Sequence, residues 1–246
     1  MRQLLTIMFV CGAAFAQTKS TTASTAKKSP APTRNLLDPS TLKAKAPETY
    51  KVQFTTTQGI VLILVTRAWA PIGADRFYNL VRGKFFDGCT FFRVKSGFMA
   101  QFGVSPNPKV TAAWSNEKMM DEPVKQSNKR GFVTFAKSSL PNSRGTQLFI
   151  NYGDNSRLDA DGFAPIGEVI EGMDVADKFY DGYGLNPDPE QAMPRLGKAW
   201  IDKNLPKADV IKLAVIVPAV APAPAAPAKA AVTKSTTTKT STTAKQ

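Results

Sequence analysis

The spacing of apolar and polar residues predicts a β-rich domain in the middle of the chain. Residues 50–54 alternate apolar and polar side chains, Gln58-Gly59 is a turn signal, and residues 60–65 are a continuous run of Ile, Val and Leu. This pattern is typical of a β-hairpin whose second strand is buried on both faces. Further strands, bounded by Gly, Pro, Asn and Asp, are expected at 90–94, 98–103, 131–136, 147–151, 165–170 and 210–217.

A segment with the spacing of a helix lies between the second and third of these strands. Pro71 suits the first turn of a helix, Gly83 suits its end, and between them Ala74, Phe77, Leu80 and Val81 fall at helical spacing. A second helix is expected over residues 173–180, and a third around 197–203. Many short strands with one or two covering helices suggest a barrel or a closed sheet.

The two ends of the chain have a different character. Residues 1–16 combine one positive charge, a short apolar run and a small-residue ending, which predicts a signal peptide cleaved after Ala16. Lipid attachment at Cys11 is disfavoured because the bulky Val10 precedes it. Residues 17–47 and 218–246 are rich in Thr, Ser, Lys, Ala and Pro, so both are expected to be disordered. The folded domain is therefore assigned to residues 48–217.

The charge of the chain follows this division. The formal net charge is +13, yet residues 48–217 hold 21 of the 32 basic and 18 of the 19 acidic residues, which leaves that domain at only +3. The basic character thus belongs to the ends, which argues against a nucleic-acid groove on the domain. Attraction of the tails to an anionic envelope is one hypothesis, and a solvated linker is the alternative.

Composition excludes several classes of catalyst. The chain has no histidine, and after cleavage Cys89 is its one cysteine, so Ser-His-Asp and Cys-His catalysis and His- or Cys-rich metal sites are not expected. A small core residue is the better interpretation of Cys89 than a nucleophile. Asp159 and Asp161 lie in a Gly-containing turn, where they are expected to stabilise the loop. Phosphate-binding glycine motifs are missing from the sequence, and no cofactor, metal or nucleotide is implied.

Rotation of a prolyl amide needs none of these groups. The barrier is resonance in the C–N bond, about 18 to 20 kcal/mol, and an apolar pocket for the ring plus a fixed donor to the amide nitrogen would lower it. An arginine suits this task because it donates without losing its proton. Residues 91–103 supply such a set, with Arg93, Phe98, Met99 and Gln101 on two adjacent strands. Alternatively, the apolar members are plain core and Arg93 is a surface residue.

Three segments resemble the motifs of the cyclophilin family. Residues 91–103 read FFRVKSGFMAQFG, similar to F-H-R-x-x-x-G-F-M-x-Q-G-G. Residues 135–150 read FAKSSLPNSRGTQLFI, similar to M-A-x-x-x-P-N-S-x-x-S-Q-F-F-I, and residues 158–174 resemble L-D-x-x-x-x-x-F-G-x-V-x-x-G-M-D. They occur in family order across some 80 residues of the chain. The resemblance implies an eight-stranded antiparallel closed barrel capped by two helices, with peptidyl-prolyl cis-trans isomerase activity.

The resemblance also implies the roles of individual residues. Arg93 would be the catalytic donor and Gln101 would bond the substrate backbone. Ala136 and Lys137 would hold the residue before proline through their backbone. The proline pocket would be walled by Phe98, Met99, Phe149, Leu158 and Phe163.

Several positions depart from the family pattern. Phe92 replaces a histidine, Phe102 replaces a glycine, and Val104 stands where an aspartate often follows. Arg157 lies where many members have tryptophan, and Phe163 where many have histidine. The rim of the pocket is therefore altered, and we expect weak sensitivity to the inhibitor cyclosporin.

Three functions follow as hypotheses. The first is a folding isomerase for proline-containing exported clients, located in a periplasm or secreted and acting as a monomer. The second is a prolyl-peptide binding module without turnover, which loss of Arg93 would have favoured. The third makes the basic tails the functional part, as a tether to the envelope.

Overall fold

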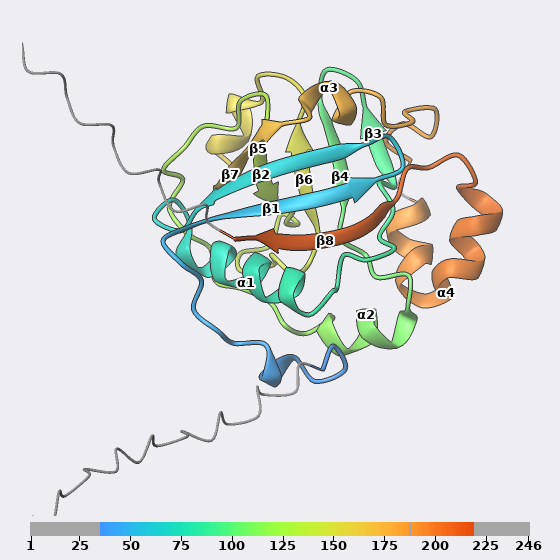
Figure 1. Ribbon diagram of the computed structural model, residues 1–246, viewed down its shortest axis with the longest axis horizontal. Coiled ribbons are helices and arrows are strands. Elements are labelled where there is room, and N and C mark those ends of the chain that lie inside the picture. Colours follow the sequence, from blue (N-terminus) through green and yellow to red (C-terminus); the bar gives the residue numbers. More distant parts are fainter. Residues whose placement is uncertain (1–34, 187, 219–246) are drawn as a thin grey trace, which may run out of the picture. The chain divides into compact units, whose positions relative to one another are not determined.

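One antiparallel sheet dominates the computed structural model (Figure 1), which describes residues 35–186 and 188–218. In spatial order its eight strands are β3-β4-β6-β5-β7-β2-β1-β8. Every neighbouring pair is antiparallel. The strand bounds are β1 (Thr49–Thr56), β2 (Ile60–Thr66), β3 (Arg93–Lys95), β4 (Met99–Phe102), β5 (Phe132–Phe135), β6 (Leu148–Asn151), β7 (Pro165–Glu171) and β8 (Ile211–Val217).

The sheet is an open half-barrel, so the predicted closed barrel is wrong. Its edge strands are β3 and β8, and within the described residues they share no ladder. An isolated bridge between Thr90 and Val210 joins the segments that precede them. The strand expected at 90–94 begins only at Arg93. Residues 88–91 make three backbone hydrogen bonds to residues 209–211, but residues 83–88 are a series of turns, so this pairing does not extend along β8.

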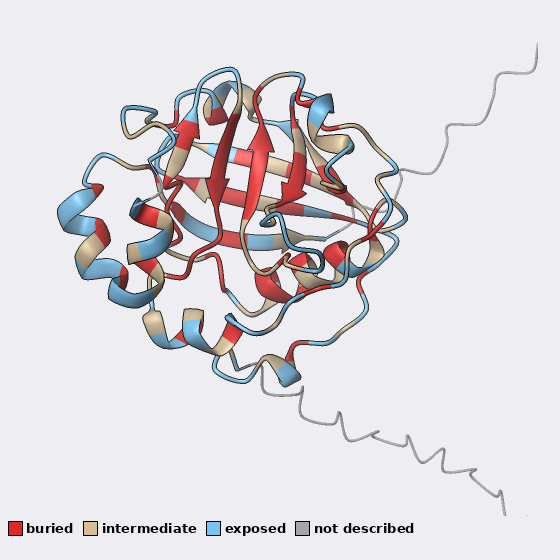
Figure 2. Ribbon diagram, turned by 180° about the vertical axis from the view of Figure 1, so that it is seen from behind, coloured by how far each residue is buried: buried red, intermediate tan, exposed pale blue. Residues whose placement is uncertain are grey.

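The core lies on the concave side of this sheet, where Figure 2 shows buried residues along the central strands. Strand β2 contributes only every second residue to it. Val61, Ile63 and Val65 are fully buried, whereas Ile60 is about half exposed and Leu62 and Leu64 are intermediate. The prediction that this strand is buried on both faces is therefore wrong, because the residues on its outer side stay partly exposed, Ile60 most of all.

Within the described residues, four α-helices surround the sheet, where the sequence pattern predicted three and the family resemblance implied two capping helices. They are α1 (Pro71–Arg82), α2 (Pro108–Trp114), α3 (Met173–Ala176) and α4 (Asp188–Asn204), and two short 3₁₀ helices occupy Pro39–Thr41 and Ser156–Asp159. Helix α1 agrees with the prediction. Helix α3 is shorter than predicted, since Phe179 leaves the helix to stack on Phe91 at 4.0 Å between ring centroids. None of these helices has the length and apolar character needed to cross a bilayer.

The N-terminal segment that the structure describes packs against α1. Leu42 and Ala46 are buried, and the backbone amides of Ala44 and Ala46 donate to Asn79 Oδ1 and Asp75 Oδ1. Residues 35–47 were expected to belong to a disordered linker; instead, Leu36, Leu42 and Ala46 pack into or against the main core. The predicted signal peptide, residues 17–34 of the linker and residues 219–246 of the tail lie outside the described residues.

Candidate active site

A row of polar and aromatic side chains crosses four strands of the sheet. Arg93 on β3 pairs in register with Gln101 on β4, Gln101 pairs with Phe149 on β6, and Phe149 pairs with Thr134 on β5. Directly opposed residues of an antiparallel pair project from the same face. The register of the sheet therefore brings together residues that are more than fifty positions apart in the sequence.

Arg93 is held by acceptors on two sides. Its Nη1 donates to Gln101 Oε1 at 2.6 Å and lies 3.3 Å from Glu190 Oε2 on α4. Gln101 in turn donates from Nε2 to Gln147 Oε1 at 2.7 Å. Arg93 Nε is buried and has no hydrogen-bond partner among the described residues. The arginine side chain is 23% exposed, so its guanidinium is fixed in place but reachable from solvent.

A cavity of about 720 Å³ opens beside this arginine. All nine residues singled out from the sequence line it: Arg93, Phe98, Met99, Gln101, Ala136, Lys137, Phe149, Leu158 and Phe163. The rings of Phe149 and Phe163 meet edge to face at 5.9 Å, while Met99 and Phe149 are almost fully buried. The cavity thus joins an apolar floor to a charged donor at its side.

One wall of the cavity is the segment after β5. The amide of Ala136 donates to the carbonyl of Gln147 at 2.9 Å. Lys137 Nζ donates to the carbonyl of Asp161 at 3.0 Å, lies 3.6 Å from Asp121 Oδ2 and stands 5.9 Å from the centroid of the Phe163 ring. The carboxylate of Asp121 thus partly balances the charge of Lys137.

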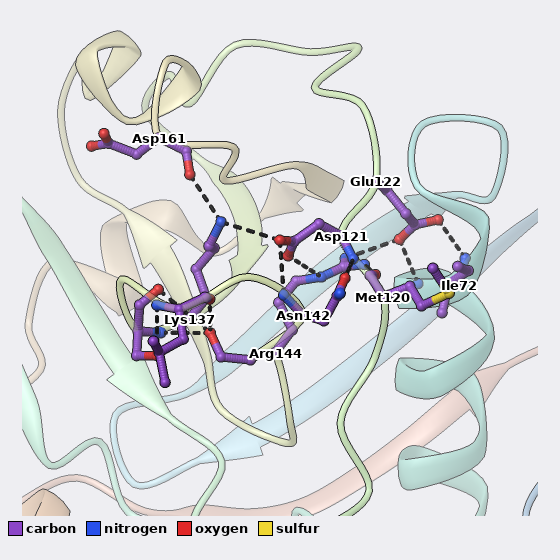
Figure 3. Close-up of polar contacts among 12 residues, drawn as sticks. Ile72, Met120, Asp121, Glu122, Lys137, Asn142, Arg144 and Asp161 are labelled. Atoms are coloured by element: carbon purple, nitrogen blue, oxygen red, sulfur yellow. Dashed lines mark hydrogen bonds and ion pairs between the residues drawn. The ribbon is translucent and has the colours of Figure 1, made fainter.

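A buried ion pair anchors the next part of this wall (Figure 3). Arg144, only 1% exposed at its side chain, donates from Nη1 to Glu122 Oε2 at 2.9 Å and from Nη2 to the carbonyl of Met120. Glu122 also accepts from the backbone amides of Ile72 and Gly73, at 2.6 and 3.0 Å, in the first turn of α1. A carboxylate is favoured there because helix N-terminal amides are unpaired. The cavity wall is therefore tied to the end of α1.

The wall formed by residues 158–163 has its own anchor. Asp159 accepts from Ser127 Oγ, from the amide of Asn128 and from Asn128 Nδ2, and the same Nδ2 donates to the carbonyl of Phe163. Burial acts to raise the pKa of Asp159, but these hydrogen bonds outweigh it and hold the pKa below its usual value. Asp159 therefore stabilises the loop, as the sequence predicted.

The residues that depart from the family pattern mostly serve packing. Phe102 is fully buried among Phe54, Phe86 and Phe91. Phe92 and Val104 belong to a second apolar cluster with Met193, Ile201 and Leu205 of the α4 region. Arg157 lies over the ring of Phe98, with Cζ 4.9 Å from its centroid. Cys89 is fully buried, and burial raises the pKa of its thiol. Cys89 is therefore a core residue, as the sequence predicted.

Sequence reasoning missed α2 and the first half of α4, which form one side of the cavity; the helix expected around residues 197–203 is the second half of α4. Thr111, Trp114 and Lys118 line the cavity from α2 and the segment after it, and Glu190 and Pro194 line the cavity from α4. Asn107-Pro108 was an available signal for α2, since Asn107 Oδ1 caps the helix and Pro108 occupies its first turn. The period of α4 is broken by Pro194 and by Gly197, whose φ is 60°.

Comparisons with known proteins agree with the resemblance found in the sequence. Residues 51–194 match the family described as cyclophilin type peptidyl-prolyl cis-trans isomerase/CLD. Peptidyl-prolyl cis-trans isomerase A of Dickeya dadantii is 34% identical over 58% of this chain and 77% of its own. Peptidyl-prolyl cis-trans isomerase B of Escherichia coli is 31% identical over 68% of this chain and 98% of its own. The crystal structure of cyclophilin AquaCyp293 from Hirschia baltica has a TM-score of 0.53 at 21% identity, covering 73% of this chain and 78% of that chain, and shares the fold.

Proposed function

The chain belongs to the cyclophilin-type peptidyl-prolyl cis-trans isomerases, and on that premise we propose that it rotates X-Pro bonds of exported proteins with Arg93 as its donor. The observation that carries this proposal is the position of Arg93 at the side of an apolar cavity, held by Gln101 and Glu190. Membership of the family already implies the isomerase activity. The proposal adds the roles of individual residues and the place where the protein acts.

The proposed chemistry is a change in hydrogen bonding and solvation, with no bond made or broken. Phe98, Met99 and Phe149 would take the pyrrolidine ring into the apolar floor, with Leu158 and Phe163 closing it. As the C–N bond twists, the lone pair localises on nitrogen, and a donor from Arg93 stabilises it. The apolar surroundings strengthen this interaction relative to water, and the guanidinium needs no proton transfer to make it.

The rest of the peptide would bind through its backbone. We assign the residue before proline to the segment of Ala136 and Lys137, because both residues line the cavity, Ala136 is small, and Lys137 Nζ is bonded to the carbonyl of Asp161. Gln101, already bonded to Arg93 and Gln147, would also contact the peptide backbone. The substrate class is then any accessible proline-containing polypeptide.

The test of Arg93 is the cis-to-trans rate of a chromogenic Ala-Ala-Pro-Phe peptide with the full chain, wild type beside Arg93→Ala. We expect wild-type acceleration and a fall of at least about tenfold in the variant, equivalent to about 1.4 kcal/mol of transition-state stabilisation. Wild-type acceleration that persists in the variant would refute the role of Arg93. Peptide binding without acceleration would instead identify a binding module.

Export rests on residues 1–16, which the structure does not describe. We propose that they direct the chain to a periplasm or to the outside, that it acts there as a monomer, and that the basic tails add weak association with the envelope. Mass spectrometry of the protein recovered from the envelope or the medium should give Gln17 as the first residue. Removal of residues 218–246 should reduce retention on envelope fractions, and unchanged retention would eliminate the tether.

A further inference from the structure

Helix α4 adds a charged wall to the cavity. Its first turn carries Glu190, which is the sole carboxylate among the described residues that line the cavity; the other charged lining residues are Arg93, Lys118 and Lys137. The Glu190 side chain is 41% exposed. Only its Oε2 contacts Arg93, and no hydrogen bond to Oε1 is found within the described part of the chain. One carboxylate oxygen thus remains open to the cleft.

This wall is anchored firmly to the domain. Phe92 and Val104 pack against Met193, Ile201 and Leu205, in a cluster separate from the main core. The amide of Lys198 donates to the carbonyl of Pro106 at 2.9 Å. Gly197 lies so close to α2 that a Cβ there would stand 2.6 Å from the Pro108 ring. Glu190 is therefore held at a fixed place beside Arg93.

The order of elements places Glu190 at one end of the cleft. Ala136 follows β5, and from there the sheet runs through Phe149 on β6 and Gln101 on β4 to Arg93 on β3, beyond which Glu190 lies. If the residue before proline binds at Ala136 and the prolyl nitrogen faces Arg93, as the proposed function holds, the residue after proline faces α4. A carboxylate at that place attracts a cationic side chain and repels an anionic one.

We propose that Glu190 is a specificity-determining residue, which makes this isomerase prefer clients with lysine or arginine directly after proline and disfavour those with aspartate or glutamate there. The proposal rests on the proposed function, because it needs the peptide direction assigned above. Since Glu190 is partly exposed and already paired with Arg93, the preference is modest, of the size of a surface ion pair.

The experiment uses the full chain and three blocked peptides, Ala-Ala-Pro-Lys, Ala-Ala-Pro-Ala and Ala-Ala-Pro-Glu, with cis-trans exchange followed by NMR so that no protease is needed. We expect kcat/KM for the lysine peptide to exceed that for the glutamate peptide by about threefold. Glu190→Gln should bring this ratio close to one. Raising the salt concentration should shrink the wild-type ratio, because screening weakens exposed charge pairs.

Asp188→Asn is the matched control. Asp188 begins the same helix, is exposed and does not line the cavity, so its loss removes the same charge and should leave the ratio unchanged. A wild-type ratio of one, or a ratio that persists in Glu190→Gln, would overturn the inference while isomerase activity stands. A wild type that accelerates none of the three peptides would overturn the proposed function and the inference with it.

Discussion

Gln101 Oε1 accepts a hydrogen bond from Arg93 Nη1 at 2.6 Å, across the directly opposed pair that joins β3 to β4. Gln101 is itself almost fully buried and is held at its other end by Gln147. The guanidinium is therefore oriented by a chain of two side-chain amides, of which Gln101 is buried and Gln147 is partly exposed. This arrangement makes the position of Arg93 depend on a neighbour that carries no charge.

Replacing Gln101 by leucine should lower kcat/KM by about tenfold. The variant removes the acceptor that fixes Arg93, and a hydrogen bond to a charged group is worth about 1.5 kcal/mol. The protease-coupled peptide assay measures this directly. Gln53→Leu, on β1 and outside the cavity lining, is the control for loss of a glutamine elsewhere in the sheet, although Gln53 is less buried than Gln101. An unchanged rate in Gln101→Leu would show that Arg93 does not depend on Gln101 for its orientation.

Cyclosporin should inhibit this enzyme only weakly, with half-inhibition above about 1 μM, or roughly 8 kcal/mol of binding free energy. The reason is the altered rim, where the Arg157 guanidinium covers the ring of Phe98 and the side chain of Phe163 stands beside Phe149. Arg157→Trp should tighten binding, because it restores an aromatic at the position where many family members have one. Inhibition of the wild type at low nanomolar concentration would contradict this account of the rim.

Replacing Glu122 by alanine should cost about 3 to 5 kcal/mol of unfolding free energy. The variant leaves Arg144 buried without its carboxylate and also uncaps the first turn of α1 (Figure 3). Urea denaturation measures the loss, and the exposed Glu171→Ala is the control. Adding Arg144→Met to Glu122→Ala should recover part of the loss, since no unpaired charge then remains. A double variant no more stable than Glu122→Ala would show that the cost lies in the cap alone.

The cavity-lining residues that lie within the three family motifs could be predicted from the sequence alone. Strands β1 to β8 and helix α1 each overlap a predicted element, and the nine motif residues line one cavity. This worked because strand alternation and motif spacing are local properties. Their roles in catalysis stay predictions.

Contacts between segments that are far apart in the sequence could not be predicted from these local patterns. The apolar run of β2 does not reveal that its outer face stays partly exposed. Nothing in residues 90–94 shows that, in the described part of the chain, only one β-bridge links the segments that precede β3 and β8. Glu190 reaches Arg93 only because Phe92 and Val104, nearly a hundred residues earlier, anchor α4. Packing between distant segments decides such contacts.

Asp159→Asn should destabilise the protein near neutral pH, and the difference from wild type should vanish in acid. The folded-state pKa of Asp159 lies below its value in the unfolded chain, about 3.9, because hydrogen bonds from Ser127 and Asn128 outweigh the effect of burial. A lowered pKa means that the charged form stabilises the fold; this contribution is present above the unfolded pKa and is lost as the pH falls through the folded one. Urea denaturation should therefore show a constant difference in unfolding free energy between the two proteins from pH 7 to about pH 5, and this difference should close below about pH 4. In a Ser127→Ala background, which lacks one of the donors to Asp159, the difference in unfolding free energy should be smaller. A difference that stays constant down to pH 3 would show that the pKa of Asp159 is not lowered in the folded protein.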